Sequence, residues 1–268
     1  MKCWQQEKNR IRTFLISKNI SFTGQRFKFK TNGTMNREKL QTKATDLKIN
    51  STRVGELMSA IKRNQITIPR FRFNLSTQDA LDLLAAHYQI AVEFRHCDFV
   101  LDENTKRALV KLAIYLTDTN PKFGVLLCGT CGNGKTTMVY ALQKTINYLN
   151  SRNHFNFLGK NFEIGMPLLD AKELVDISRN PKRFDEYRTR TMLAIDDMGK
   201  EPAEVLDFGN VTNPIIDLIE YRYHHQLFTV ITTNLDPEMI KKKYGVRVSD
   251  RFREMLQVIV FQDISYRH

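Results

Sequence analysis

Residues 129–136, with the sequence GTCGNGKT, constrain the fold of this 268-residue chain more than any other feature. They match the pattern G-x-x-x-x-G-K-[ST], in which glycines let successive backbone N–H groups turn toward a polyphosphate. The apolar run GVLLCG at 124–129 leads into this loop, and residues 135–150 have the pattern of a helix. Such a helix points its positive end at bound phosphates. The sequence therefore predicts a phosphate-binding site between a strand and a helix.

Two side chains of this loop have expected roles in chemistry. Lys135 is expected to reach the β and γ phosphates of a nucleotide, and the hydroxyl of Thr136 is expected to bind Mg²⁺. The predicted nucleotide-binding residues of the loop are Gly129, Thr130, Cys131, Gly132, Asn133, Gly134, Lys135, Thr136 and Thr137.

An aspartate pair follows the apolar run at residues 192–195. If that run is a strand, Asp196 and Asp197 lie at its carboxyl end, where open parallel sheets bind their ligands. Asp196 would then hold Mg²⁺, and Asp197 would orient or deprotonate an attacking water. Aspartates are also common at strand ends without any such role. The phosphate loop favours the functional interpretation.

Five apolar runs along the chain have the length of strands, and segments with helical patterns separate them. This alternation predicts an α/β fold whose five-stranded parallel sheet is covered by helices on both faces. Ser76, with Asp79 three residues later, resembles a capping box for a helix that reaches residue 94. Further helices are expected at 51–63 and 103–116. The expected strands are 124–129, 162–168, 192–196, 228–233 and 257–262.

The positive charge of the chain is concentrated near its start. The net charge is +12, but residues 1–75 hold 17 basic and 4 acidic residues, whereas the remainder is close to neutral. A basic segment indicates a polyanionic partner such as nucleic acid, or a solvated tail. Within it, RFKFK at 26–30 has the alternation of a strand, whose phenylalanines either stack on bases or are buried. We expect a small, basic, mostly helical domain over residues 1–100 and a nucleotide-binding domain over residues 101–268.

Neither a membrane span nor a disulfide framework is expected. No apolar run approaches about 20 residues, and the opening MKCWQQEKNR is charged where a signal peptide is apolar. The four cysteines are too few and too unevenly spaced for a disulfide scaffold. We therefore expect reduced thiols, no membrane partner and a cytoplasmic location.

Four motifs occur in the order GTCGNGKT, LAIDDM, ITTN and RVSDRFRE. Together they resemble the AAA+ ATPases, specifically the DnaC-type helicase loaders and the IstB-type transposition helpers, over roughly residues 100–268. The resemblance implies an AAA+ P-loop NTPase fold that binds ATP and Mg²⁺ and hydrolyses ATP. It makes Asn234 of ITTN the sensor 1 residue, although an Asn here can also simply cap a turn. The implied catalytic residues are Lys135, Asp197, Asn234 and Arg251.

In the same resemblance, Arg251 is the arginine finger that acts on the ATP of a neighbouring subunit. Arg247 is the competing candidate, and a solvated surface role remains open for Arg251. The ending DISYRH resembles a short S-x-R tail, in which Arg267 would sense phosphate within its own subunit. Because six residues follow the last predicted strand, we expect no C-terminal helical lid.

A basic segment between the second and third strands matches the position of a helical insertion in DnaC-type loaders that faces single-stranded DNA. It is equally consistent with a charged, solvated helix face, and KKKYGVR at 241–247 has the same two interpretations. The basic residues of the segment are Arg179, Lys182, Arg183, Arg188 and Arg190.

The resemblance favours a replicative helicase loader that binds single-stranded DNA and a helicase. Such a protein is expected to form a homo-oligomer, as a ring or a helical filament, and to contact its partner through the N-terminal region. The alternative within the same fold is a transposition helper that acts on duplex DNA with a transposase. A third possibility is an ATP-switched interaction module that does not hydrolyse ATP.

Overall fold

A computed structural model describes residues 50–64, 70–151, 165–202, 205–207 and 210–261. The chain divides into two compact units, residues 1–65 and 66–268. The described part of the first unit is α3 (Ser51–Asn64), whose position agrees with the predicted helix. The strand expected at 26–30 lies outside the described residues. Four large apolar side chains of α3 are exposed: Val54, Leu57, Met58 and Ile61.

The second unit is built on five parallel strands in the order β2-β3-β6-β1-β7. This confirms the predicted α/β fold with its parallel sheet. The predicted strand at 162–168 shares only Leu168 with the observed strand, because Gly165 and Pro167 do not favour strand structure; residues 162–164 lie outside the described ranges. The strands are β1 (Gly124–Gly129), β2 (Leu168–Asp170), β3 (Met192–Met198), β6 (Phe228–Thr233) and β7 (Gln257–Phe261).

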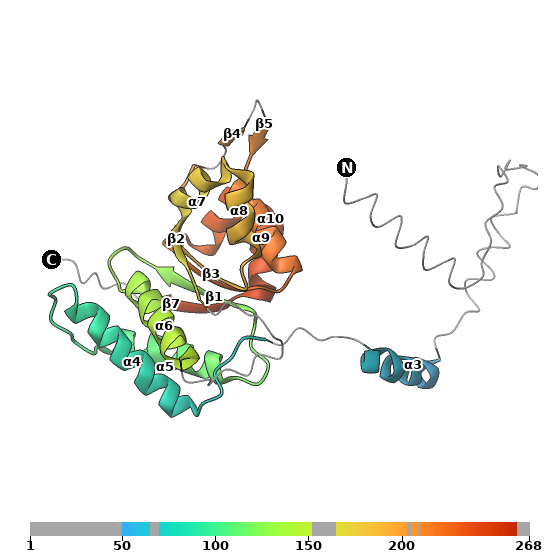
Figure 1. The fold of residues 1–268 in the computed structure, drawn as a ribbon, viewed down its shortest axis with the longest axis horizontal. Helices are drawn as coiled ribbons and strands as arrows, with labels where there is room; N and C mark the ends of the chain where they lie inside the picture. The colour runs from blue at the N-terminus through green and yellow to red at the C-terminus, as the bar shows by residue number, and fades with distance from the viewer. Residues whose placement is uncertain (1–49, 65–69, 152–164, 203–204, 208–209, 262–268) are drawn as a thin grey trace, which may run out of the picture. The chain divides into compact units, whose positions relative to one another are not determined.

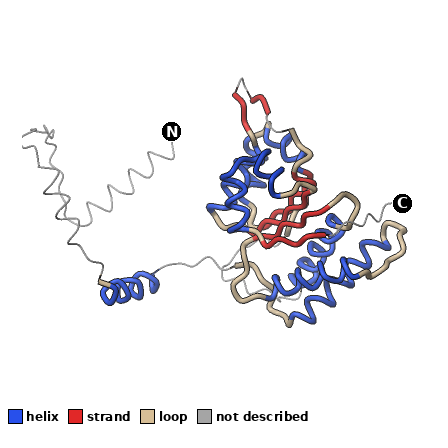
Figure 2. Tube along the Cα trace, turned by 180° about the vertical axis from the view of Figure 1, so that it is seen from behind, coloured by secondary structure: helices blue, strands red, loops and turns tan. Residues whose placement is uncertain are grey.

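Helices cover both faces of this sheet, as Figures 1 and 2 show. Alternate residues of β1 enter two separate cores: Val125 and Leu127 pack in one, and Leu126 packs in the other. The first core includes α4 (Thr77–Glu93), α5 (Glu103–Thr117) and α6 (Lys135–Asn150). The second is covered by α7 (Ala171–Ser178), α8 (Pro181–Thr189), α9 (Pro214–His224) and α10 (Pro237–Met255).

A two-stranded antiparallel hairpin follows β3 and was not predicted from the sequence. It consists of β4 (Val205–Asp207) and β5 (Asn210–Thr212), and it extends beyond α7 and α8 in Figure 1. Its strands are three residues each, too short for a periodic apolar pattern to reveal. Within the described ranges, each helix is too short or too polar to cross a lipid bilayer.

Residues 70–100 fold with the second unit, although the sequence places them in the expected N-terminal domain. The division between the compact units falls after residue 65. The physical reason is that α4 buries Ala80, Leu84 and Tyr88 in the core that α5 and α6 share. Ahead of α4, the backbone N–H of Phe73 donates to the carbonyl of Leu116 at 2.6 Å.

A completely buried arginine, Arg222 of α9, fixes the end of α8 to the start of β6. Its burial lowers the pKa of its guanidinium to about 9, so the group stays charged at neutral pH. All three of its nitrogens donate to protein oxygens at 2.6–3.5 Å: the hydroxyl of Thr229 and the carbonyls of Tyr187, Arg188, Arg190 and Phe228.

We expect Arg222→Met to lower the free energy of unfolding by about 2–5 kcal/mol, because each buried acceptor left without a donor costs about 1–3 kcal/mol. Urea unfolding followed by circular dichroism measures the change. Arg188→Met is the matched control. Arg188 pairs with Asp185 on the surface of α8, and such pairs contribute about 1 kcal/mol or less. Equal effects of the two substitutions would contradict the role given to Arg222.

Candidate nucleotide site

The predicted phosphate loop connects β1 to α6 and depends on glycine. Gly129, Gly132 and Gly134 have φ angles of 146°, 82° and 88°, which side chains other than glycine rarely adopt. A Cβ atom on Gly129 would lie 2.2 Å from the carbonyl oxygen of Phe261 and 2.7 Å from the Asn133 Nδ2. The loop therefore approaches the edge strand β7 too closely for any other residue at position 129.

The N-terminus of α6 lacks the side-chain cap that other helices of this unit have. α6 follows Gly134, which provides no side-chain acceptor for the N–H groups of the first turn. Those N–H groups remain available to an external acceptor, and a phosphate at a helix N-terminus fits this need. The residues that cap α4, α5, α7, α8, α9 and α10 are Ser76, Asp102, Asp170, Asn180, Asn213 and Asp236.

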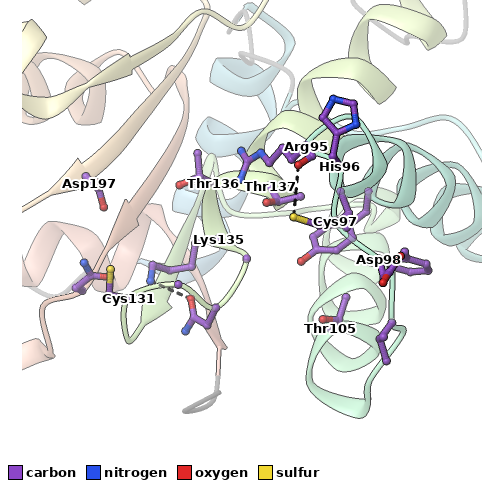
Figure 3. A pocket seen from close by; sticks show the side chains of 18 of the residues that line it. Arg95, His96, Cys97, Asp98, Thr105, Cys131, Lys135, Thr136, Thr137 and Asp197 are labelled. Carbon is purple, nitrogen blue, oxygen red and sulfur yellow. Dashed lines mark hydrogen bonds between the residues drawn. The ribbon is translucent and has the colours of Figure 1, made fainter. Parts of the chain in front are cut away.

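Lys135 folds back over the loop that precedes it (Figure 3). Its Nζ donates to the carbonyl oxygens of Gly129 at 2.9 Å and Thr130 at 2.5 Å, and to the Oδ1 of Asn133 at 3.0 Å. Burial lowers the pKa of Lys135, and the negative charge of Asp197 opposes this effect. The ammonium group thus lies within the loop, where phosphate oxygens could replace the carbonyls as its acceptors.

The side chains expected to bind magnesium are in contact. The hydroxyl of Thr136 lies 3.1 Å from both carboxylate oxygens of Asp196. Mg²⁺ prefers such oxygen ligands, completed by phosphate and water. The residues present therefore fit a magnesium–nucleotide complex, in which Thr136 and Asp196 would hold the metal and Lys135 the phosphates.

Thr232 is a site residue to which the sequence analysis gave no role. Its hydroxyl donates to Asp196 Oδ1 at 2.5 Å and accepts from the backbone N–H of Asp197 at 2.8 Å. The side chain is buried on β6, which lies beside β3. Thr232 therefore orients the expected metal ligand and fixes the backbone of the expected catalytic aspartate. Its position in ITTN gave the only sequence signal.

Asp197 occupies an irregular position at the end of β3. The pairing of β3 with β6 shifts register between Ile195 and Met198, and Asp197 has a φ of 55°. In a regular strand, successive side chains point to opposite faces, and a bulge can redirect one of them. Here Asp196 accepts a hydrogen bond from Thr136, while Asp197 lines the neighbouring cavity.

The cavity has a volume of about 660 Å³ and lies over the phosphate loop. Residues 131–137, Asp197, Lys200 and Asn234 form one part of its lining. Residues 95–100, at the end of α4 and before α5, form much of the rest, with Tyr88, Val92 and Thr105. Figure 3 shows Asp197 on one side of Lys135 and Arg95, His96, Cys97 and Asp98 on the other. No sequence pattern indicated this second wall, because only the fold brings it to the loop.

Asn234 lies at the end of β6 and contributes to the cavity, whereas Arg251 does not. Arg251 forms an ion pair with Glu220 of α9 and lies 5.2 Å from the ring centre of Tyr223, with its side chain 12% exposed. Arg247 lies 3.7 Å from the same Glu220 carboxylate and is 78% exposed. Arg267 lies outside the described residues.

The basic side chains between β2 and β3 have different environments. Lys182 and Arg183 are exposed in the first turn of α8. Arg188 pairs with Asp185 and lies over the ring of Tyr221 at 4.4 Å. Arg179 and Arg190 are exposed as well, so most of the predicted DNA-facing surface is directed to solvent.

No family model and no curated protein matches this sequence. Among solved structures, the fold is similar to the DnaC helicase loader, at 22% identity and a TM-score of 0.47, over 65% of this chain and 98% of that one. DnaI matches at 22% identity and a TM-score of 0.46, over 63% of this chain and 88% of that one. AMPPCP-bound DnaA from Aquifex aeolicus matches at 18% identity and a TM-score of 0.40, over 60% and 48% of the two chains.

The chain's own topology carries the assignment of the fold. The phosphate loop follows β1 at the centre of the sheet, and the aspartate pair ends β3, with β6 between these two strands. The second unit therefore has an α/β fold with the phosphate loop and the aspartate pair at the ends of the strands that the motifs predict.

Proposed function

We propose that this protein is a magnesium-dependent AAA+ ATPase that acts on DNA in replication, as a helicase loader that binds single-stranded DNA. The contact between Thr136 and Asp196, beside Lys135 and the uncapped end of α6, carries the ATPase part of the proposal. Bound Mg²⁺ would polarise the phosphate oxygens and offset their charge.

We assign each residue of this site a separate role. Lys135 and the first N–H groups of α6 bind the phosphates, and Thr136 and Asp196 hold the metal. Asp197 accepts a proton from the attacking water or orients it. Asn234, at the end of the adjacent strand, contacts the water or the γ-phosphate. Arg251 completes the site of a neighbouring subunit by stabilising charge on the transferring phosphoryl group.

The DNA and partner parts of the proposal rest on charge and on resemblance. Lys182 and Arg183 on α8, and Lys241 and Lys242 on α10, are exposed cations of the ATPase unit. The positive charge near the start of the chain would also attract DNA or an acidic region of the helicase. An assembled ring or filament would repeat the cations of each subunit along one DNA strand.

The joint substitution Lys182→Ala and Arg183→Ala is expected to weaken binding to single-stranded DNA and to reduce its salt dependence. Two lost phosphate contacts lower the slope of log K against log salt by about 1.4, at about 0.7 per contact. Fluorescence anisotropy over a salt series measures both quantities.

The control for this experiment is the pair Lys106→Ala and Lys111→Ala on α5, which covers the other face of the sheet. An unchanged slope in the α8 variant would remove α8 from the DNA surface. A wild-type preference for duplex over single-stranded DNA would contradict the loader and favour the transposition helper.

A further inference from the structure

A second lysine, Lys200, lines the same cavity as Lys135. It belongs to the turn after β3, and its Nζ forms an ion pair with the Oδ2 of Asp197. The Lys200 side chain is 45% exposed and that of Asp197 is 26% exposed, so both groups remain accessible from the cavity. Lys200 is not part of the phosphate-loop motif, but its ammonium group contacts Asp197, the expected catalytic aspartate.

The backbone on each side of Lys200 is firmly held. The N–H of Gly199 donates to the Glu201 carboxylate at 2.8 Å, and Glu201 is buried. Lys243 of α10 donates to the carbonyl oxygens of Gly199 and Glu201, both at 2.5 Å, and pairs with the Glu201 carboxylate at 3.2 Å. With its backbone fixed, Lys200 can change partners only through its flexible side chain.

Asp197 interacts electrostatically with both lysines of the cavity. Its hydrogen bond raises the pKa of Lys200, and its charge opposes the lowering of the Lys135 pKa by burial. Lys200 and Cys131 of the phosphate loop line the same cavity. A terminal phosphate bound there carries more negative charge than one carboxylate, so it would attract the ammonium group of Lys200 away from Asp197.

We propose that Lys200 exchanges partners when a nucleoside triphosphate binds: it leaves Asp197 and contacts the terminal phosphate. A diphosphate lacks that group and leaves the Lys200–Asp197 pair intact. Lys200 is thus the residue that distinguishes triphosphate from diphosphate, and Asp197 becomes free to accept a hydrogen bond from water only when the triphosphate is present. This inference rests on the proposed function, since it requires a nucleotide at the phosphate loop.

Calorimetric titration of the full-length protein with AMPPCP and with ADP, both with Mg²⁺, tests the proposal. Lys200→Met should weaken AMPPCP binding about tenfold and leave ADP binding unchanged. A tenfold loss of affinity is the lower end of what the loss of one charge-assisted hydrogen bond causes. Lys200→Arg, which keeps the charge, should restore most of the AMPPCP affinity. Lys111→Met removes one exposed charge from α5 and should leave the ratio of the two affinities as in the wild type.

Equal effects of Lys200→Met on the two nucleotides, or no effect on either, would overturn the role of Lys200. That result would leave the proposed function intact as long as the wild type binds both ligands. Failure of the wild-type protein to bind either nucleotide would instead overturn the proposed function. Thermal unfolding of each variant checks that the substitution at the half-exposed Lys200 leaves the fold unchanged.

Discussion

Asp197→Asn is expected to lower the rate of ATP hydrolysis by about 10²–10⁴-fold while ATP still binds, because the amide cannot accept the proton of the attacking water. The substitution suits the local backbone. Asp197 has a φ of 55°, a region that asparagine adopts readily among residues other than glycine. Single-turnover measurements with saturating protein separate the chemical step from binding.

Thr232→Val can be measured beside Asp197→Asn, because it removes the hydroxyl that contacts both aspartates and keeps the shape of the side chain.

Turnover in Asp197→Asn above about a tenth of the wild-type rate would show that another group activates water. Tight ATP binding with no turnover even in the wild-type protein would support the non-hydrolysing interaction module.

Arg251→Ala is expected to reduce steady-state ATP turnover by about 10³–10⁵-fold with little change in ATP affinity, the effect of losing an arginine finger. Arg251 pairs with Glu220 and does not line the cavity, so we expect it to act on the ATP of a neighbouring subunit. Arg247→Ala is the matched control, since Arg247 pairs with the same carboxylate from the same helix.

Mixing two inactive variants tests whether this arginine acts between subunits. Arg251→Ala subunits retain the phosphate loop, and Lys135→Ala subunits retain the finger, so their mixed interfaces should recover part of the wild-type turnover. If no activity returns although the mixture assembles, Arg251 does not act in trans. Loss of turnover in Arg247→Ala alone would assign the finger to Arg247.

The sequence was informative where a local pattern has one structural solution. The glycine-rich loop predicted both its preceding strand and its following helix with the observed bounds, and LAIDDM placed its aspartates at a strand end. These motifs work because phosphate and metal binding require particular residues at fixed spacing within one segment. The alternation of apolar runs and helical patterns was likewise sufficient for the parallel sheet.

The other parts of the site depend on contacts between distant segments. Thr232 and Asp196 are 36 positions apart, and the wall at residues 95–100 reaches the loop only because α4 packs with α6. Lys200 looks like an ordinary surface lysine in the sequence, and its pairing with Asp197 depends on the turn between them. The packing of α4 with the second unit has the same origin, since the amphipathic pattern of this helix gives no sign of which core it joins.

The division after residue 65 bears on how a protein of this kind can evolve. Every described residue that lines the cavity, beginning with Tyr88, lies in the second unit. Recombination near residues 65–69 could therefore replace the basic first unit while leaving the nucleotide cavity complete. If the first unit binds the partner, as we propose, one such genetic event could change the partner without altering the cavity.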